Sequence, residues 1–183
     1  MRVEALRASL TPSSSSKSGL PAGVLERPSL AVFAEVRINR AALAEGDDEP
    51  LDAIETTLSA VWAELSPTEL IVLGETATTL LAVSNSPPDE ALAARVIAAC
   101  VRAHRRVFNG PDPRRAVELG IAVHVGALHV NETGAVLPSG LARARSWSPA
   151  GLSGVAASRA ALAEACHDKE PVAGAAVFFW VER

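Results

Sequence analysis

The sequence has few cysteines and no long apolar run, and each shortage excludes a class of protein. Its two cysteines, Cys100 and Cys166, stand far apart in alanine-rich segments, a spacing that fits neither a zinc site nor a disulfide framework. No apolar stretch approaches the roughly 20 residues that a membrane-spanning helix needs. The first residues lack the basic-then-apolar pattern of a secretory signal peptide. We therefore expect a cytoplasmic protein without membrane contact, in which both cysteines are small core residues.

Positive charge is also scarce. The formal net charge is −4, whereas nucleic-acid-binding domains concentrate Lys and Arg on one face. The densest basic groups, 104–106 and 114–115, flank a short Pro/Gly loop, and we expect them to be solvated charges at helix ends. No nucleic-acid partner is expected. The sequence also contains no P-loop, no nucleophile–base pair and no Cys/His cluster.

Length and composition predict one folded domain behind a tail. A chain of 183 residues, with 49% hydrophobic and 21% charged residues, is long enough for a sizeable core. Residues 1–28 include the stretch LTPSSSSKSGLPAG, which has too little apolar material to offset the entropy of ordering. We expect 1–28 to be a flexible tail and 29–183 to be the folded domain.

Hydrophobic periodicity and turn residues predict the order of helices and strands in the folded domain. In chain order we expect a strand 29–36, an amphipathic helix through 51–65, a strand–glycine turn–strand unit over 68–83, a long helix through 92–107, a strand pair over 117–137 that turns at 131–134, a short helix around 139–146, a strand end and helix over 153–166, and a closing strand 174–182. Helices interleaved with antiparallel hairpins indicate an α+β fold, with helices packed on a largely antiparallel sheet.

Four segments carry a more specific signal: AVFAEV at 31–36, IVLGETATTLLAV at 71–83, LGIAVHVGALHVNETGAVL at 119–137 and GVAASRAALAEA at 154–165. In this order they resemble the class III nucleotidyl (adenylate and guanylate) cyclase catalytic domain. The third segment is the most specific, because it is similar to the family's Gly-Ile-x-x-His-x-Gly pattern. The resemblance spans 29 to about 182 and implies a ferredoxin-like, cyclase-homology sandwich.

The resemblance implies a metal site made of two carboxylates. Glu35 and Glu75 stand where the family has two aspartates that hold divalent cations, which polarise the triphosphate and activate the ribose hydroxyl for attack. Mg²⁺ and Mn²⁺ prefer such oxygen ligands. An alternative needs no metal: Gly74-Glu75 is a common hairpin turn, and Glu35 is then a strand-end carboxylate that faces solvent.

The chain departs from the family pattern at several positions. Both carboxylates are glutamates, which reach one methylene further than aspartate. No glycine follows Glu35 until Gly46, so the family's glycine-containing phosphate loop is missing. The segment TELIVLGE offers only apolar residues and Glu69 in place of the lysine that selects the base.

The family's Asn-x-x-x-Arg helix falls within 135–147. The simplest register places Ala142 at the asparagine and Ser146 at the arginine, and a slip of one residue brings Arg145 to the arginine position. Arg145 is therefore our candidate catalytic residue, and Arg143 is a second candidate for phosphate contact. Alternatively, both are exposed helix arginines.

Three other side chains need an interpretation. His124 and His129 lie five apart on strand-like sequence, so we expect them on opposite faces of the sheet rather than on one metal. His124 is interpreted as a structural histidine. Trp147 is expected to be partly exposed and to serve as an interface residue.

Three functions remain open. The first is a degenerate cyclase-like domain that has lost efficient chemistry and acts as a regulatory or protein-interaction module in signalling, with no cofactor. The second is an active, unusual cyclase that makes a 3′,5′-cyclic nucleotide from a nucleoside triphosphate, with Mg²⁺ or Mn²⁺ held by Glu35 and Glu75. The third is an unrelated α+β interaction domain. The resemblance implies a homodimer, or a partnership with another cyclase-like chain.

Overall fold

The computed structural model describes residues 23–38, 49–108, 117–163 and 169–182. Its elements, in chain order, are β1 (Val24–Ile38), α2 (Glu49–Leu65), the 3-10 turn η2 (Ser66–Thr68), β2 (Leu70–Glu75), β3 (Thr79–Ser84), α3 (Glu90–Phe108), β4 (Val117–Asn131), β5 (Val136–Gly140), the 3-10 turn η3 (Ala144–Ser146), β6 (Gly154–Ser158), α4 (Arg159–Leu162), β7 (Pro171–Val172) and β8 (Ala175–Glu182). Among them, no helix is both long and apolar enough to cross a membrane.

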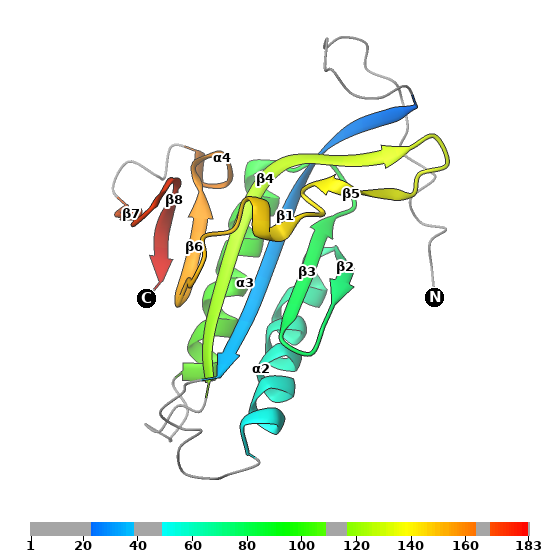
Figure 1. The fold of residues 1–183 in the computed structure, drawn as a ribbon. Coiled ribbons are helices and arrows are strands. Elements are labelled where there is room, and N and C mark those ends of the chain that lie inside the picture. The colour runs from blue at the N-terminus through cyan, green and yellow to red at the C-terminus, as the bar shows by residue number, and fades with distance from the viewer. Residues whose placement is uncertain (1–22, 39–48, 109–116, 164–168, 183) are drawn as a thin grey trace.

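The strands form one eight-stranded sheet in the order β2-β3-β1-β4-β6-β8-β7, with β5 paired to β4. Every pair is antiparallel except β4 and β6, which run parallel. The two long helices, α2 and α3, cover one face of this sheet (Figure 1). This arrangement confirms the predicted α+β class and its largely antiparallel sheet.

Local sequence explains where α3 begins and ends. At its start, the Asp89 carboxylate accepts a hydrogen bond from the Leu92 amide at 2.6 Å, which satisfies one of the free amides of the first turn. Arg105 and Arg106 stand in the last turn, where positive charge is favourable. These two arginines are the helix-end charges that the sequence predicts, whereas the neighbouring His104 is buried.

The main core lies between the sheet and the helices. Val61 and Leu65 of α2 and Val96 of α3 are fully buried there against inward-facing side chains of β1, β3, β4 and β6. Cys100 is part of this core, as predicted, and burial raises the pKa of its thiol to about 12. Cys166 lies outside the described residues.

Strands β1 and β4 pair along their whole length, from Val24 opposite Asn131 to Ile38 opposite Val117. Residues 24–28, which the sequence prediction assigned to the tail, therefore belong to the sheet. This end of the pair projects beyond the helices together with β5 (Figure 1). At this end His129 of β4 contacts both neighbouring strands. Its Nδ1 lies 2.7 Å from the Ser139 hydroxyl on β5, and its Nε2 lies 3.4 Å from the Glu26 carboxylate on β1.

The segment around 139–146 differs from its prediction as a short helix. Strand β5 continues to Gly140, whose φ of +57° turns the chain, and only the single 3-10 turn η3 follows. Downstream, Ser158 begins a helix as expected, because its hydroxyl accepts a hydrogen bond from the Ala161 amide. The short strand β7 was not predicted.

Candidate functional site

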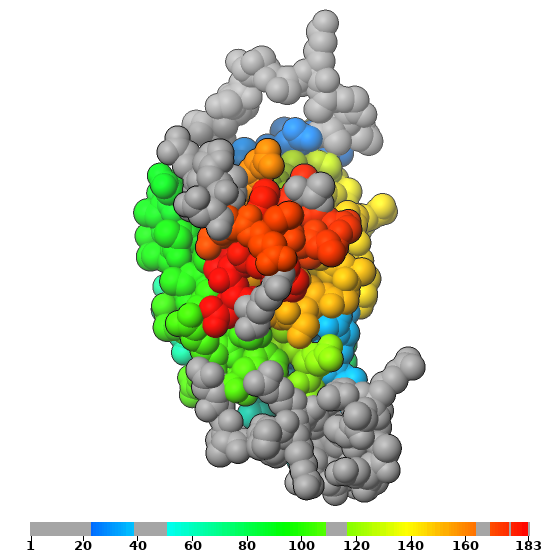
Figure 2. Space-filling model, turned by 90° about the vertical axis from the view of Figure 1, so that its left-hand side faces the viewer, coloured from blue at the N-terminus to red at the C-terminus, as the bar shows by residue number. Residues whose placement is uncertain are grey.

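Residues 141–153, called the strap from here on, run from β5 to β6 across the sheet face that the helices leave uncovered (Figure 1). Leu141 and Ala144 of the strap are buried in a cluster with Ala31 and Phe33 of β1. Figure 2 looks onto the β7–β8 edge and shows α3 in green on one side and yellow to amber residues of β5 and the strap on the other. The strap therefore supplies the third layer of the fold.

Gly120 lets the strap approach the sheet backbone. A Cβ at this position would lie 2.2 Å from the Leu152 carbonyl oxygen, well inside contact distance. That oxygen accepts a hydrogen bond of 2.7 Å from Arg37 on β1, and Arg37 also pairs with Glu118 at 3.0 Å. The first glycine of the Gly-Ile-x-x-His-x-Gly motif is thus explained by backbone-to-backbone packing of strand and strap.

Trp147 anchors the middle of the strap in an aromatic cluster. Its ring lies 6.4 Å from Phe33, 5.2 Å from His124 and 6.4 Å from Phe178 between centroids. The indole N–H donates to the Leu141 carbonyl oxygen at 3.1 Å. Trp147 is half-buried, so its predicted partial exposure is confirmed.

His124 is the polar member of this cluster. It packs against Trp147 and Phe178, and its Nδ1 is buried without a hydrogen-bond partner among the described residues. Burial lowers the pKa of His124 below its usual value, so the neutral imidazole is favoured. This environment agrees with the structural role predicted for His124. His129 lies five positions further along β4 and therefore on the opposite face of the sheet.

Glu35 and Arg145, two of the predicted site residues, are in direct contact. The Arg145 guanidinium donates to the Glu35 carboxylate at 2.8 Å, with 21% of the glutamate side chain and 76% of the arginine side chain exposed. Glu35 stands on β1 and Arg145 on η3 of the strap, so this ion pair joins the strap to the sheet. Both groups come from one chain.

Glu75 is placed away from this pair. The strand ladder sets Glu35 opposite Thr79 and Glu75 opposite Leu80, and successive strand residues point to opposite faces. Glu35 therefore belongs to the strap face and Glu75 to the helix face. The cause is a β-bulge at 72–74, which shifts the register of β2 by one residue. Strand β3 also separates the two backbones by about 10 Å.

A divalent cation shared by these two glutamates does not fit the arrangement. The carboxylates stand on opposite faces, and the Glu35 carboxylate already has a cationic partner in Arg145. Within the described ranges, no group of three or more His, Cys, Asp and Glu side chains is arranged to hold a metal ion. Hard cations need several oxygen ligands around them, and Glu35 by itself supplies too few.

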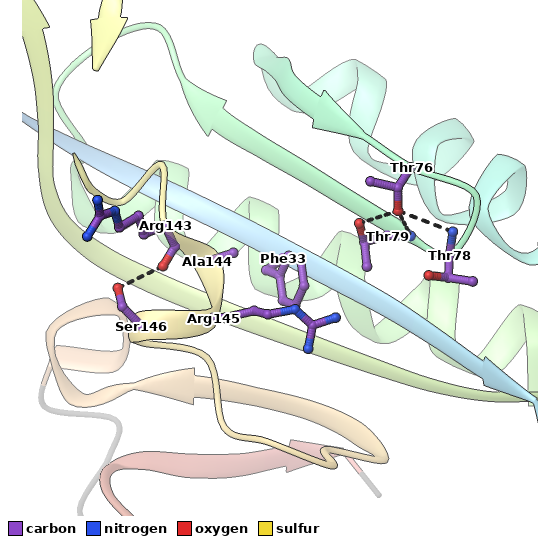
Figure 3. Close-up of a pocket in the computed structure, with 8 residues that line it drawn as sticks. All are labelled: Phe33, Thr76, Thr78, Thr79, Arg143, Ala144, Arg145 and Ser146. Carbon is purple, nitrogen blue, oxygen red and sulfur yellow. Dashed lines mark hydrogen bonds between the residues drawn. The ribbon is translucent and has the colours of Figure 1, made fainter. Parts of the chain in front are cut away.

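A pocket of about 580 Å³ opens beside the ion pair, between the strap and the β2–β3 hairpin. It is lined by Phe33, Thr76, Thr78, Thr79, Arg143, Ala144, Arg145 and Ser146. Figure 3 shows the Arg145 side chain extending over β1 toward the hairpin, whereas Arg143 points away from it. The volume lies within the range of about 300–1,000 Å³ that is typical of small-molecule sites.

Sequence reasoning missed the hairpin threonines and Arg37. The Thr76 hydroxyl accepts hydrogen bonds from the Thr78 and Thr79 amides, a turn pattern that the TATT tetrapeptide at 76–79 could have indicated. Nothing local in the sequence points to the contact between Arg37 and Leu152, because the partners lie 115 residues apart.

No protein-family model and no curated protein matches the sequence. Solved structures do match the fold. The guanylyl cyclase Cya2 aligns with a TM-score of 0.58 and 16% identity over 86% of this chain and 92% of that chain. The monomeric guanylyl cyclase domain of the RhoGC fusion protein from the aquatic fungus Blastocladiella emersonii aligns with a TM-score of 0.63 and 10% identity over 88% and 99%.

The adenylyl cyclase CyaB from P. aeruginosa aligns with a TM-score of 0.58 and 11% identity over 86% of this chain and 93% of that chain. The chain thus has the fold of the class III nucleotidyl cyclase catalytic domain, and the resemblance seen in the sequence is confirmed as a shared fold. The part of the third hypothesis that expected a different fold with the same element order is therefore wrong.

Proposed function

We propose that this chain is a degenerate cyclase-homology domain that does not form cyclic nucleotides and acts as a regulatory or protein-interaction module in signalling. The observation that carries the proposal is the ion pair between Glu35 and Arg145. It joins the carboxylate expected to hold a cation to the arginine expected to contact phosphate. Each group therefore satisfies the charge of the other.

Electrostatics explains why this pair opposes catalysis. A cation that approaches Glu35 must displace a guanidinium held at 2.8 Å, and a phosphate that approaches Arg145 must compete with the Glu35 carboxylate. An ion pair with one partner this exposed contributes little to stability, but each group still offsets the charge of the other. The missing phosphate loop and base-selecting lysine point the same way, since transfer at phosphorus depends on positioning and charge stabilisation.

An active cyclase is the second candidate. The fold of the guanylyl and adenylyl cyclases above supports it, as does the retention of a carboxylate at both expected metal positions, Glu35 and Glu75. This function requires Mg²⁺ or Mn²⁺ and a nucleoside triphosphate. It also requires Arg145 to leave Glu35 and Glu75 to come to the strap face.

Product formation distinguishes the two candidates. The full chain is incubated with each of the four common nucleoside triphosphates and Mn²⁺, and mass spectrometry is used to look for 3′,5′-cyclic products. We expect none from the wild type, from Glu35→Ala or from Glu75→Ala. A cyclic product that the wild type forms and both variants lose would establish the active cyclase and refute the regulatory module.

Self-association is the other part of the proposal. We expect a homodimer or a complex with another cyclase-like chain, since twofold dimers are the commonest soluble assemblies. Structures of the RhoGC guanylyl cyclase domain include both monomeric and dimeric forms. Sedimentation velocity over a range of protein concentrations measures the state directly. A monomer at every concentration would leave only a hetero-partner as the second chain.

A further inference from the structure

Three strands of the described sheet, β2, β5 and β7, pair with a neighbour on one side only. The open side of such a strand presents backbone N–H and C=O groups to any other extended chain, and proteins commonly protect it with proline, lysine or a very short strand. Strand β5 contains Pro138, and β7 has only two residues, the first of which is Pro171. The open sides of β5 and β7 are therefore protected from pairing.

Strand β2, at the opposite margin of the sheet from β7 (Figure 1), contains neither proline nor lysine in its sequence LIVLGE. The strand is well anchored, because Leu70 is buried in the main core and Ile71 and Leu73 pack against the cluster under the strap. Val72, in contrast, is 41% exposed. The bulge at 72–74 bends the end of the strand, whereas 70–72 keep a regular ladder with β3. This margin therefore offers a fixed apolar edge with an open side.

The chain segment that contains β2 is acidic. Residues 49–94 include eight Asp and Glu and no Lys, Arg or His. Glu69 directly precedes β2 and Glu75 ends it, and both side chains are exposed and form no ion pair within the described ranges. Arg27 of β1 reaches β3, where it donates to the Ser84 carbonyl oxygen, and it pairs with neither glutamate. A strand with cations at both ends would complement this edge.

We propose that β2 is a docking edge for an extended segment of another protein, in which apolar residues alternate with polar ones and Lys or Arg stands at both ends. The segment adds to the sheet as a further strand: its backbone pairs with the open side of β2, and its cations lie beside Glu69 and Glu75. This inference rests on the proposed function, because it gives the interaction module a surface and a class of partner.

A second copy of this chain fits the edge less well. Antiparallel pairing of two β2 strands across Val72 would place Glu69 of each copy opposite Glu75 of the other. Like charges directly opposite each other destabilise a strand pair, and the acidic segments 49–94 of the two copies would approach one another. The charge of the edge therefore favours a basic partner over self-association.

Fluorescence anisotropy of three labelled peptides with the full chain tests the docking edge. The first peptide is KTVTVTK, the second is ETVTVTE, and the third is KTVTVTK with N-methyl groups on its five central amides, which removes the N–H donors of a strand. We expect the first to bind about tenfold more tightly than either of the others, because only it combines backbone donors with favourable charge. Its binding should also slow hydrogen–deuterium exchange of the 70–75 amides.

Variants of the protein locate the site. Val72→Lys places a cation on the exposed edge and should weaken binding of KTVTVTK about tenfold, since lysine blocks strand addition and repels the peptide. Val177→Lys is the matched control, because Val177 is also an exposed strand valine (58%) but stands on β8. The double change Glu69→Gln and Glu75→Gln should weaken binding about threefold, as expected for exposed ion pairs, whereas Glu132→Gln at the β4–β5 turn should have no effect.

Several outcomes would overturn the docking edge. They are equal binding of the three peptides, no binding up to about 1 mM, which corresponds to about −4 kcal/mol, and equal weakening by Val72→Lys and Val177→Lys. Self-association of the wild type that Val72→Lys abolishes would assign the edge to a second copy and would also overturn the proposal. These readouts are independent of catalysis: a cyclic product from the wild type refutes the proposed function, whereas the peptide data decide the docking edge.

Discussion

The two faces of the sheet are covered in different ways. On the helix face, two long amphipathic helices bury a continuous apolar core in which residues such as Leu65 and Val96 have no exposed surface. On the strap face, a thirteen-residue segment without a regular helix is held by two smaller apolar clusters, by an ion pair and by a hydrogen bond to a carbonyl oxygen. Apolar burial is strong and has no direction, whereas polar contacts are weaker and can be exchanged. The helix face therefore supplies most of the stability, and the strap face adds smaller apolar clusters and a few exchangeable polar contacts.

The largest effect is expected on the helix face. Leu65→Ala removes a fully buried side chain of α2 and should lower the free energy of unfolding by about 3 kcal/mol, because it leaves a cavity. Urea denaturation followed by circular dichroism measures the loss. The rate of hydrogen–deuterium exchange of the strap amides in the native state should stay close to that of the wild type. Faster hydrogen–deuterium exchange of the strap amides in Leu65→Ala would show that the two faces are not independent.

A smaller effect is expected where strap and strand touch. Gly120→Ala places a Cβ against the Leu152 carbonyl and should cost about 2 kcal/mol, because the backbone must move. It should also speed the hydrogen–deuterium exchange of the strap amides, which Leu65→Ala should leave unchanged. Gly74→Ala is the matched control, since a Cβ there meets nothing within 4 Å. Equal losses from the two alanine variants would contradict this account of Gly120.

The smallest effect concerns pH. Burial lowers the pKa of His124 from its ordinary value of 6.5, so below that value the unfolded chain takes up the proton more readily than the folded chain. Stability that is complete above pH 6.5 should therefore fall as the pH drops below it. His124→Phe keeps an aromatic ring in the cluster and should flatten this part of the profile, measured by urea denaturation at several pH values. Identical profiles for variant and wild type would show that another group is responsible.

Much of the architecture was predictable because it depends on local pattern. Apolar side chains at helical spacing indicate α2 and α3, and glycine turns between apolar runs indicate the hairpins β2–β3 and β4–β5. The motif around Gly120 and His124 indicated the family of folds. Glu35 was identified as a site residue because it stands where the family has a metal-binding aspartate, and the structure places it in contact with Arg145.

The pairing of Glu35 with Glu75 depended on a register that local pattern does not specify. A regular ladder that continued the pairing of Val72 with Ala82 would set Glu75 opposite Thr79, on the same face as Glu35. The bulge at 72–74 sets it opposite Leu80 instead. One inserted residue reverses every later side chain of a strand. No local signal in the sequence indicates that insertion.

The sequence by itself determined the order of the main helices and strands, the apolar faces of the two long helices and the class of fold, because these follow from the spacing of apolar residues along the chain. Only the tertiary structure decided that the strap crosses the second face, that Arg145 reaches Glu35 and that Glu75 does not. Those contacts join residues such as Glu35 and Arg145, 110 positions apart. Their geometry depends on sheet register and on close backbone approach at Gly120, which arise only when distant segments pack together.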